Sequence, residues 1–296
     1  MTPWQAPPDA AGRFAPAVDQ ATVGYDTPLR RVIRYAGAAG IGTLEVPVHC
    51  VLAAERESGR TGLADLLRES GTGIGQLSCG TGIPADLTIG QAAWPAAIDA
   101  WRRACALAAR LGGVPLSLFV PRPSSPRQRI TAPELTSRLA ELTAVCAPLG
   151  LAVNVEIHDP VHGRDGGDLW ERWQVLPGAR AGLLIDTATL AVAPGDSAAY
   201  LDALPSGAIG WIQLADLVGF TAAGTCPVRA LPGKGVIDLA AMLNACAGNG
   251  YRGPVSVEVP CSATVPPGVV REHVRAAADA LHAPPLAALF TWDMPR

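Results

Sequence analysis

Hydrophobic residues in this chain gather into short runs of strand length, separated by longer segments with helical spacing. The short runs end at Gly, Pro or Asp and are rich in Val, Ile and Leu. Apolar runs of about four to eight residues with such boundaries are typical of strands buried on both faces. We therefore predict eight strands, with the sequences QATVGY, GTLEVPVH, GIGQLSCG, VPLSLFVP, LAVNVEIHD, AGLLIDTAT, IGWIQLAD and GPVSVEVP.

The longer segments have the apolar spacing of amphipathic helices, and several of them close with Gly, as helix C-termini often do. Examples are PLRRVIRYAGAAG, WPAAIDAWRRACALAARLG, APELTSRLAELTAVCAPLG and IDLAAMLNACAGNG. Strands that alternate with helices predict a parallel sheet covered by helices. Eight such units in 296 residues predict a single-domain α/β fold, the (β/α)8 TIM barrel. A doubly wound sheet is less favoured, because VGYDTPLRR lacks the Gly-rich loop that usually follows its first strand.

No composition shift marks a boundary within the chain. We predict a flexible N-terminal arm over residues 1–16, a barrel over 17–283 and a C-terminal tail over 284–296 that begins with a short helix. With 49% hydrophobic residues the chain can bury a large core. A net charge of -3 without a Lys/Arg-rich run argues against nucleic acid or an anionic membrane as a partner.

The N-terminus has no secretory pattern, and no apolar run approaches the length of a membrane span. The seven cysteines are widely and irregularly spaced without a CxxC pair. These features predict a cytoplasmic protein with reduced thiols.

Polar residues follow the predicted strands at the ends where a TIM barrel carries its active site. Side chains alternate along a strand, so VNVEIHDP directs Asn154, Glu156 and His158 to one side, toward the barrel axis. Carboxylates that converge there repel one another unless a cation compensates them. Oxygen ligands without a thiolate favour Mn²⁺, Mg²⁺ or Co²⁺. The other polar residues at these ends are Glu45, His49, Asp186, Gln213, Asp216 and Glu258.

Several motifs in the second half of the chain resemble those of the xylose-isomerase-like TIM barrels. The motifs are NVEIHD, LLIDTAT, WIQLAD, LPGKGVIDL and GNGYRGPVSVEV, and the resemblance extends over roughly residues 22–281. The family includes sugar isomerases and epimerases as well as inosose and dehydroshikimate dehydratases. Its members hold one divalent metal with residues of strands five to eight. The matching metal ligands here are Glu156, Asp186, Gln213 and Glu258.

The resemblance implies a metal-dependent isomerase or epimerase acting on a sugar-like hydroxyketone, with Mn²⁺ as the expected metal and Mg²⁺ or Co²⁺ as alternatives. Glu156 and Glu258 would move the proton next to the metal-bound carbonyl, through an enediolate. Arg229 matches a residue that contacts substrate oxygens in the family, and we also assign His49, Glu45 and Asp216 to the substrate pocket. The expected partner is a small polyhydroxy ketone or cyclic polyol, and a homo-oligomer is possible because family members are often dimers or tetramers.

Two residues depart from the family pattern. Thr189 stands where the family usually has His, and Gln213 stands where many members have His. Dehydratase branches tend to carry Gln at the second position and often Glu-x-His on strand five, which EIH matches, so His158 would be the base of a lyase. A metal-dependent dehydratase is therefore one alternative. The missing His at Thr189 motivates another, an inactive barrel that serves as a binding subunit.

Overall fold

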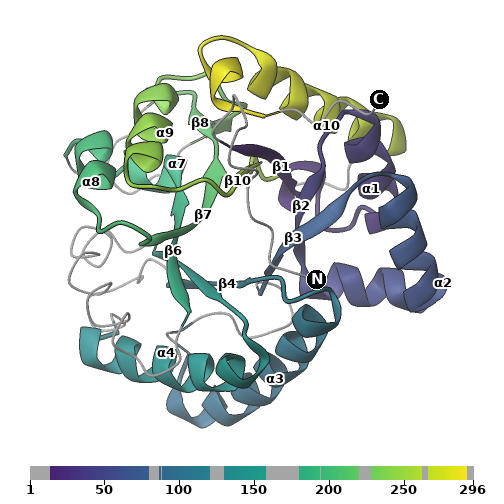
Figure 1. Cartoon of the computed structure of the whole chain (residues 1–296), viewed down its shortest axis with the longest axis vertical. Coiled ribbons are helices and arrows are strands. Elements are labelled where there is room, and N and C mark those ends of the chain that lie inside the picture. Colours follow the sequence, from purple (N-terminus) through teal and green to yellow (C-terminus); the bar gives the residue numbers. More distant parts are fainter. Residues whose placement is uncertain are drawn as a thin grey trace.

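Eight parallel strands form a closed barrel in the computed structural model (Figure 1). The model describes residues 14–79, 87, 89–120, 130–157, 180–193, 195–219, 228–261 and 266–291. The barrel strands are β1 (Ala15–Asp19), β2 (Thr43–Pro47), β3 (Gly73–Ser78), β4 (Leu116–Val120), β5 (Val153–Ile157), β6 (Ala181–Asp186), β7 (Ile209–Leu214) and β10 (Pro254–Val257). Their order around the barrel is β1-β10-β7-β6-β5-β4-β3-β2. The predicted TIM-barrel fold is confirmed.

Helices surround the barrel on the outside (Figure 1). They are α1 (Leu29–Ala38), α2 (Val48–Glu69), α3 (Trp94–Arg110), α4 (Ala132–Cys146), α7 (Thr187–Ala191), α8 (Ser197–Ala203), α9 (Leu239–Gly248) and α10 (Pro267–His282). Short 3-10 helices cover Gln20–Val23, Gln91–Ala93, Ala147–Leu149 and Leu286–Leu289. None of the helices in the described ranges is both long enough and apolar enough to span a membrane.

The predicted helices form because local signals and packing agree. The Thr131 side chain accepts a hydrogen bond from the Glu134 N–H at 3.3 Å and so caps α4. The apolar face of α3 buries Trp101 completely, and its indole N–H donates to the Leu142 carbonyl of α4 at 3.0 Å. This contact joins two neighbouring helices over the same side of the barrel.

The first strand differs from the prediction. The stretch QATVGY is not a strand, because Gln20–Val23 forms a 3-10 turn that the Asp19 side chain caps. The strand instead spans Ala15–Asp19, with Ala17 opposite Thr43 of β2 and Pro16 opposite Val255 of β10. Pro16 weakens the local strand signal, yet proline is tolerated at the beginning of a strand.

The segments at the two ends of the described chain meet beside β1. The Phe14 N–H donates to the Leu289 carbonyl at 3.0 Å, and the Phe14 carbonyl accepts from the Thr291 N–H at 2.8 Å. Phe14 and Phe290 are both buried. The structure therefore includes residues 14–16 in or beside the barrel, ahead of the predicted start at residue 17, and it packs residues 286–290 against the barrel.

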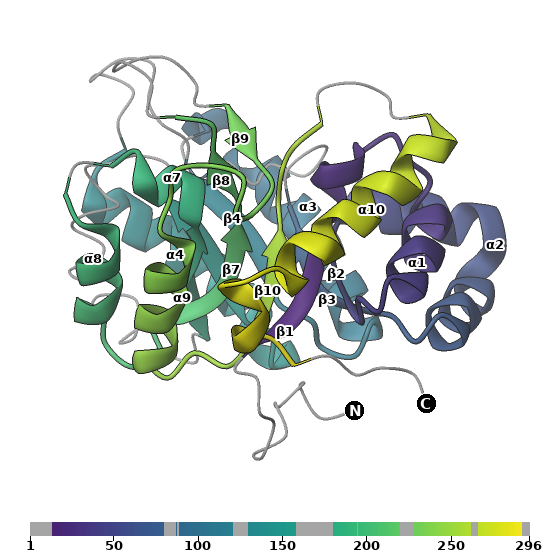
Figure 2. The same ribbon diagram turned by 90° about the horizontal axis from the view of Figure 1, so that it is seen from above.

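A small antiparallel ribbon stands at the end of the barrel where the strands finish (Figure 2). It consists of β8 (Asp216–Leu217) and β9 (Arg229–Ala230), with Leu217 opposite Arg229. Its position brings Arg229 over the carboxyl ends of the neighbouring barrel strands.

Candidate functional site

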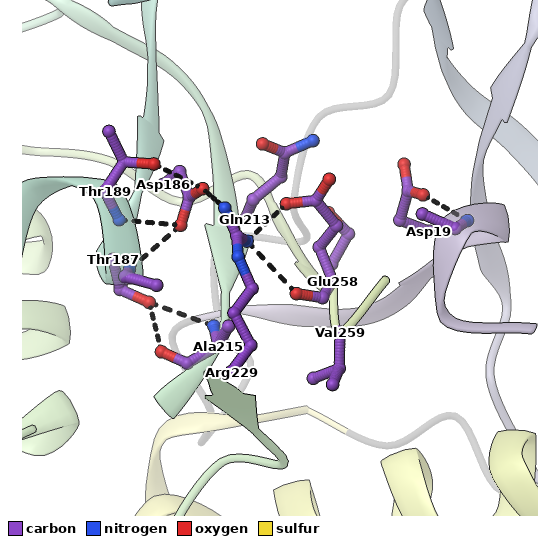
Figure 3. A network of polar contacts seen from close by, with 12 residues as sticks. Asp19, Asp186, Thr187, Thr189, Gln213, Ala215, Arg229, Glu258 and Val259 are labelled. Carbon is purple, nitrogen blue, oxygen red and sulfur yellow. Dashed lines mark hydrogen bonds and ion pairs between the residues drawn. The ribbon is translucent and has the colours of Figure 1, made fainter. Parts of the chain in front are cut away.

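Three predicted metal ligands converge at the carboxyl ends of neighbouring strands (Figure 3). Asp186 is the last residue of β6, Gln213 lies opposite it on β7, and Glu258 directly follows β10. Parallel strands of a barrel end at one face, and their inward side chains therefore meet. The guanidinium of Arg229 joins Asp186 and Glu258, and β7, which carries Gln213, lies between the strands of these two residues.

Arg229 forms ion pairs with two of the three. Its Nη2 pairs with Asp186 Oδ2, and its Nη1 donates to Glu258 Oε2 at 2.7 Å. Burial by itself would lower the pKa of Arg229, but the neighbouring charges of Asp186 and Glu258 outweigh it and raise the pKa further. The positively charged guanidinium of Arg229 therefore occupies the position between these two carboxylates.

Asp186 also caps the short helix α7. Its Oδ1 accepts from the backbone N–H groups of Ala188 at 2.9 Å and Thr189 at 3.3 Å. Its Oδ2 accepts from the Thr189 hydroxyl at 2.8 Å. Thr189, at the position where the resemblance implies a His, is therefore hydrogen-bonded to the Asp186 carboxylate itself.

Gln213 presents an unsatisfied oxygen. Its side chain is 4% exposed, and within the described ranges its Oε1 has no hydrogen-bond donor. Its Nε2 donates to Glu45 Oε1 at 3.0 Å. A buried carbonyl oxygen without a partner is energetically costly, so an external ligand at this position would relieve the cost.

Glu45 lies beneath this site, fully buried in the middle of β2. Its carboxylate accepts from Gln76 Nε2 at 2.8 Å, Trp211 Nε1 at 2.8 Å and Ser256 Oγ at 2.6 Å, besides Gln213. Burial raises the pKa of Glu45 to about 7, although the hydrogen bonds from Ser256, Gln76 and Trp211 counteract the rise. The sequence-based expectation had Glu45 lining the substrate pocket, whereas the structure encloses it inside the barrel.

The predicted inward face of β5 is confirmed for Asn154. Its side chain is buried and its Nδ2 donates to Gln76 Oε1 at 2.6 Å. Gly210 makes room for this amide, because a Cβ there would collide with Asn154 Oδ1. The same alternation directs Glu156 inward. His158 lies outside the described residues, so its expected role stays a prediction.

Glu156 is half-buried on β5, opposite Leu184 of β6. Its negative charge is among the causes that raise the pKa values of Glu258, Glu45 and Asp19. Burial is the largest cause for Glu258, and Arg229 counteracts it. Glu156 therefore belongs to the same electrostatic cluster as the residues around Arg229.

The two other residues assigned to the substrate pocket lie at different places. His49 is in the first turn of α2, with its ring 6.3 Å from that of Tyr25 and its Nε2 3.3 Å from Cys50 Sγ. Asp216 is buried, and its oxygens accept from the backbone N–H groups of Leu217 at 2.8 Å, Gly235 at 2.8 Å and Ile237 at 2.9 Å. Asp216 thus organises the turn that follows Arg229.

Sequence reasoning missed Asp19. It is 2% exposed at the end of β1, and in Figure 3 it lies on the far side of Glu258 from Asp186. Burial and the charge of Glu45 raise its pKa well above the usual range, and the Ala21 N–H that donates to it counteracts the rise. An acidic residue at the end of the apolar run APAV was the available signal, but the strand was expected further along the chain.

The donor chemistry of the site suits a hard divalent cation. Asp186, Gln213 and Glu258 offer oxygens only, and the Arg229 guanidinium shows that positive charge is favoured between the carboxylates. Among the residues that the structure describes, no three His, Cys, Asp or Glu side chains are arranged to hold a metal ion. The candidate set therefore depends on the Gln213 amide, and a cation there would have to displace Arg229 from Asp186.

The fold and these residues define a TIM barrel with oxygen-rich side chains at its carboxyl-terminal mouth. The chain belongs to the xylose isomerase-like TIM barrel family, whose model matches residues 33–281. Comparison with curated protein sequences gave no match.

Solved structures share the fold over almost the whole chain. A xylose isomerase domain protein from Alicyclobacillus acidocaldarius is 23% identical, with a TM-score of 0.73 over 93% of this chain and 99% of its own. The IOLI protein with a binding zinc atom is 16% identical, with a TM-score of 0.73 over 93% and 98%. A D-allulose 3-epimerase from Methylomonas sp. is 18% identical, with a TM-score of 0.68 over 90% and 96%.

Proposed function

We propose that this protein is a divalent-metal-dependent isomerase or epimerase that acts on a sugar-like hydroxyketone. The observation that carries the proposal is the set of buried oxygens at neighbouring strand ends: Asp186 and Glu258 are paired with the Arg229 cation, and Gln213, opposite Asp186, has an unsatisfied carbonyl oxygen. The zinc in the IOLI structure and the activity of the D-allulose 3-epimerase, two proteins of the same fold, support it.

Asp186, Gln213 and Glu258 would hold the cation, and Mn²⁺ is the metal that we propose. Glu156 is the fourth predicted ligand and would have to move toward them from β5 to complete the set. When bound, such a cation supplies Lewis acidity toward a substrate carbonyl and makes the neighbouring C–H bond more acidic. Arg229, released from Asp186, would use its forked N–H donors on substrate oxygens.

Glu156 and Glu258 would move the proton at the carbon next to the carbonyl. They stand on β5 and after β10, with β6 and β7 between them around the barrel. Carboxylates on two sides of a bound substrate can remove a proton on one face and return it on the other. Burial raises the pKa of Glu258, and the charge of Arg229 counteracts the rise, so loss of the Arg229 contact would make this carboxylate a stronger base.

A dehydratase is the second candidate function. The stretch EIH at residues 156–158 matches the Glu-x-His pattern that dehydratase branches of the family often carry. Gln213 in place of His points the same way, and His158 would then be the base that removes the proton before the β-hydroxyl leaves.

Turnover in deuterated water distinguishes these functions. We would incubate the Mn²⁺-loaded protein with ketohexoses, including D-allulose and D-fructose, and with cyclic polyol ketones, and follow the products by NMR. Deuterium at the carbon next to the carbonyl, without loss of water, is the expected result. Glu156→Gln should reduce the exchange by about 100-fold or more, because proton transfer by a positioned side chain contributes at least that factor.

Glu57→Gln, an exposed glutamate on α2, is the matched control and should retain activity. Formation of an enone or aromatic product would replace the isomerase with the dehydratase. Full activity and Mn²⁺ binding in Glu156→Gln would contradict the assigned role of Glu156. A wild-type protein that neither binds Mn²⁺ nor turns over any of these compounds would favour the binding subunit.

A further inference from the structure

Glu45 makes a contact with Gln213 that bears directly on the proposed metal site. We infer that Glu45 is a positioning residue, whose buried carboxylate holds the Gln213 amide so that its carbonyl oxygen faces the metal. This inference rests on the proposed function, since it assigns a purpose to the oxygen that Gln213 would offer. Glu45 lies on β2, and the expected metal ligands include no residue of that strand.

An amide can turn either of its two ends toward the site, because its oxygen and nitrogen are nearly equal in size. Only the oxygen can bind a metal. A carboxylate accepts hydrogen bonds and donates none, so the Gln213 end that faces Glu45 must be Nε2, at 3.0 Å. The Oε1 end then lies on the other side, where it is buried and without a donor in the described ranges.

The Glu45 carboxylate is itself held on both oxygens. Gln76 shares Oε1 with Gln213, while Trp211 and Ser256 donate to Oε2 at 2.8 and 2.6 Å. All of these groups are at most 4% exposed. A buried acceptor with four donors has no freedom to turn, so it fixes the orientation of the side chain above it.

This arrangement matches a general feature of metal sites. A metal-ligating His usually donates its second ring N–H to a carboxylate, which sets the orientation of the ring. Gln213 offers the same pair of groups, an N–H donor on one side and a lone pair on the other. Glu45 therefore explains how an amide serves at a position where many relatives are expected to have an imidazole.

Glu45→Gln tests this inference directly, because the indole N–H of Trp211 can donate a hydrogen bond to position 45 but cannot accept one. The amide introduced at position 45 must keep its oxygen toward the Trp211 N–H, so its NH₂ group takes the place of Oε1 and faces the side chains of both Gln76 and Gln213. Each of these two amides would have to turn its oxygen toward position 45 to accept a hydrogen bond from it. Gln213 then turns its oxygen toward position 45 and its NH₂ toward the metal. We expect the Mn²⁺ affinity, measured by calorimetry and by electron paramagnetic resonance at pH 8, to fall by about 10-fold or more.

Ser256→Ala is the matched control, since it removes a donor from the same carboxylate but leaves the contact with Gln213. It should lower the melting temperature and keep the Mn²⁺ affinity within about threefold of the wild type, a smaller change than those typical of metal-site support residues. A merely structural role for Glu45 would give Ser256→Ala and Glu45→Gln parallel losses.

The double variant Glu45→Gln/Gln213→Glu should recover the affinity. Its carboxylate at position 213 accepts from the new amide and presents its second oxygen to the metal, whichever way it is turned. If Glu45→Gln does not fold, Glu45→Asp keeps the charge but withdraws it from Gln213, and the same loss is expected. Unchanged affinity in a folded position-45 variant would overturn this inference alone. Absence of Mn²⁺ binding by the wild type would overturn the proposed function and this inference together.

Discussion

Arg229 carries the positive charge between Asp186 and Glu258. Its side chain is 21% exposed, while those of Asp186 and Glu258 are 0% and 14% exposed. Removal of one partner from a largely buried ion pair leaves the other charges uncompensated, and this costs more than the pair contributes when it is complete. The sequence identified both carboxylates through their place after apolar strands. It did not show that Arg229 would join them, because the contact depends on the ribbon β8–β9.

We predict that Arg229→Gln destabilises the metal-free protein. The free energy of unfolding, measured with urea in the presence of chelator, should fall by about 1–3 kcal/mol, a value reduced from the fully buried case because the guanidinium is partly exposed. Lys234→Gln removes the same charge from an exposed position in the following turn and should change stability little. Equal stability of the two variants would show that the ion pairs of Arg229 contribute nothing.

The ribbon β8–β9 and the turn after it form the element that supports Arg229. The motif LPGKGVIDL was recognised in the sequence, and its physical basis is a close approach between backbone and side chain. A Cβ on Gly235 would collide with the Leu217 carbonyl oxygen and with the Asp216 carboxylate. Asp216, which sequence reasoning assigned to substrate, is occupied with three backbone N–H groups of this element.

Gly235→Ala should therefore destabilise the protein by about 1–3 kcal/mol, the range for an overpacked site, and should disturb the position of Arg229. Gly219→Ala in the same region is a matched control, because a Cβ there meets no atom within 4 Å. Thermal unfolding monitored by circular dichroism compares the two. The proposed close approach would be wrong if Gly235→Ala melted at the temperature of Gly219→Ala.

The molecule as a whole buries several carboxyl groups inside one barrel. Burial is the largest cause that raises the pKa values of Asp19, Glu45 and Glu258. A raised folded-state pKa means that the folded protein binds the proton more tightly than the unfolded chain. For Glu45 the folded protein holds the extra proton at pH values between 4.5, the ordinary pKa of the carboxyl group, and about 7, its raised pKa. Stability therefore decreases as pH rises through this window.

We predict that the metal-free protein unfolds at lower urea concentration at pH 7.5 than at pH 5.5. The Glu45 carboxyl contributes at most roughly 2 kcal/mol to this difference, because only the part of its window between pH 5.5 and about 7 lies within the comparison and each pKa unit is about 1.4 kcal/mol. Glu45→Gln removes this titration, so its urea midpoint should depend less on pH, and the remaining slope belongs to Asp19 and Glu258. A wild-type midpoint that rises between pH 5.5 and 7.5 would contradict the prediction.

The sequence by itself determined the barrel and the inward positions of its strands, because the period of apolar residues is a local property that burial on both faces imposes. Alternation was enough to direct Asn154 inward, and it directs Glu156 the same way. The first strand was misplaced because Pro16 and the short run APAV give a weak local signal that pairing with β2 and β10 overrides.

Only the tertiary structure decided which polar side chains meet. Glu45 and Gln213 are 168 positions apart in the chain, and Arg229 and Asp186 are 43 apart. No periodicity connects such residues, because their contact arises from closure of the barrel and from the ribbon above it. The sequence supplied the charged and amide groups, and the closed sheet determined that Glu45 supports Gln213 from below while Arg229 joins Asp186 and Glu258 from above.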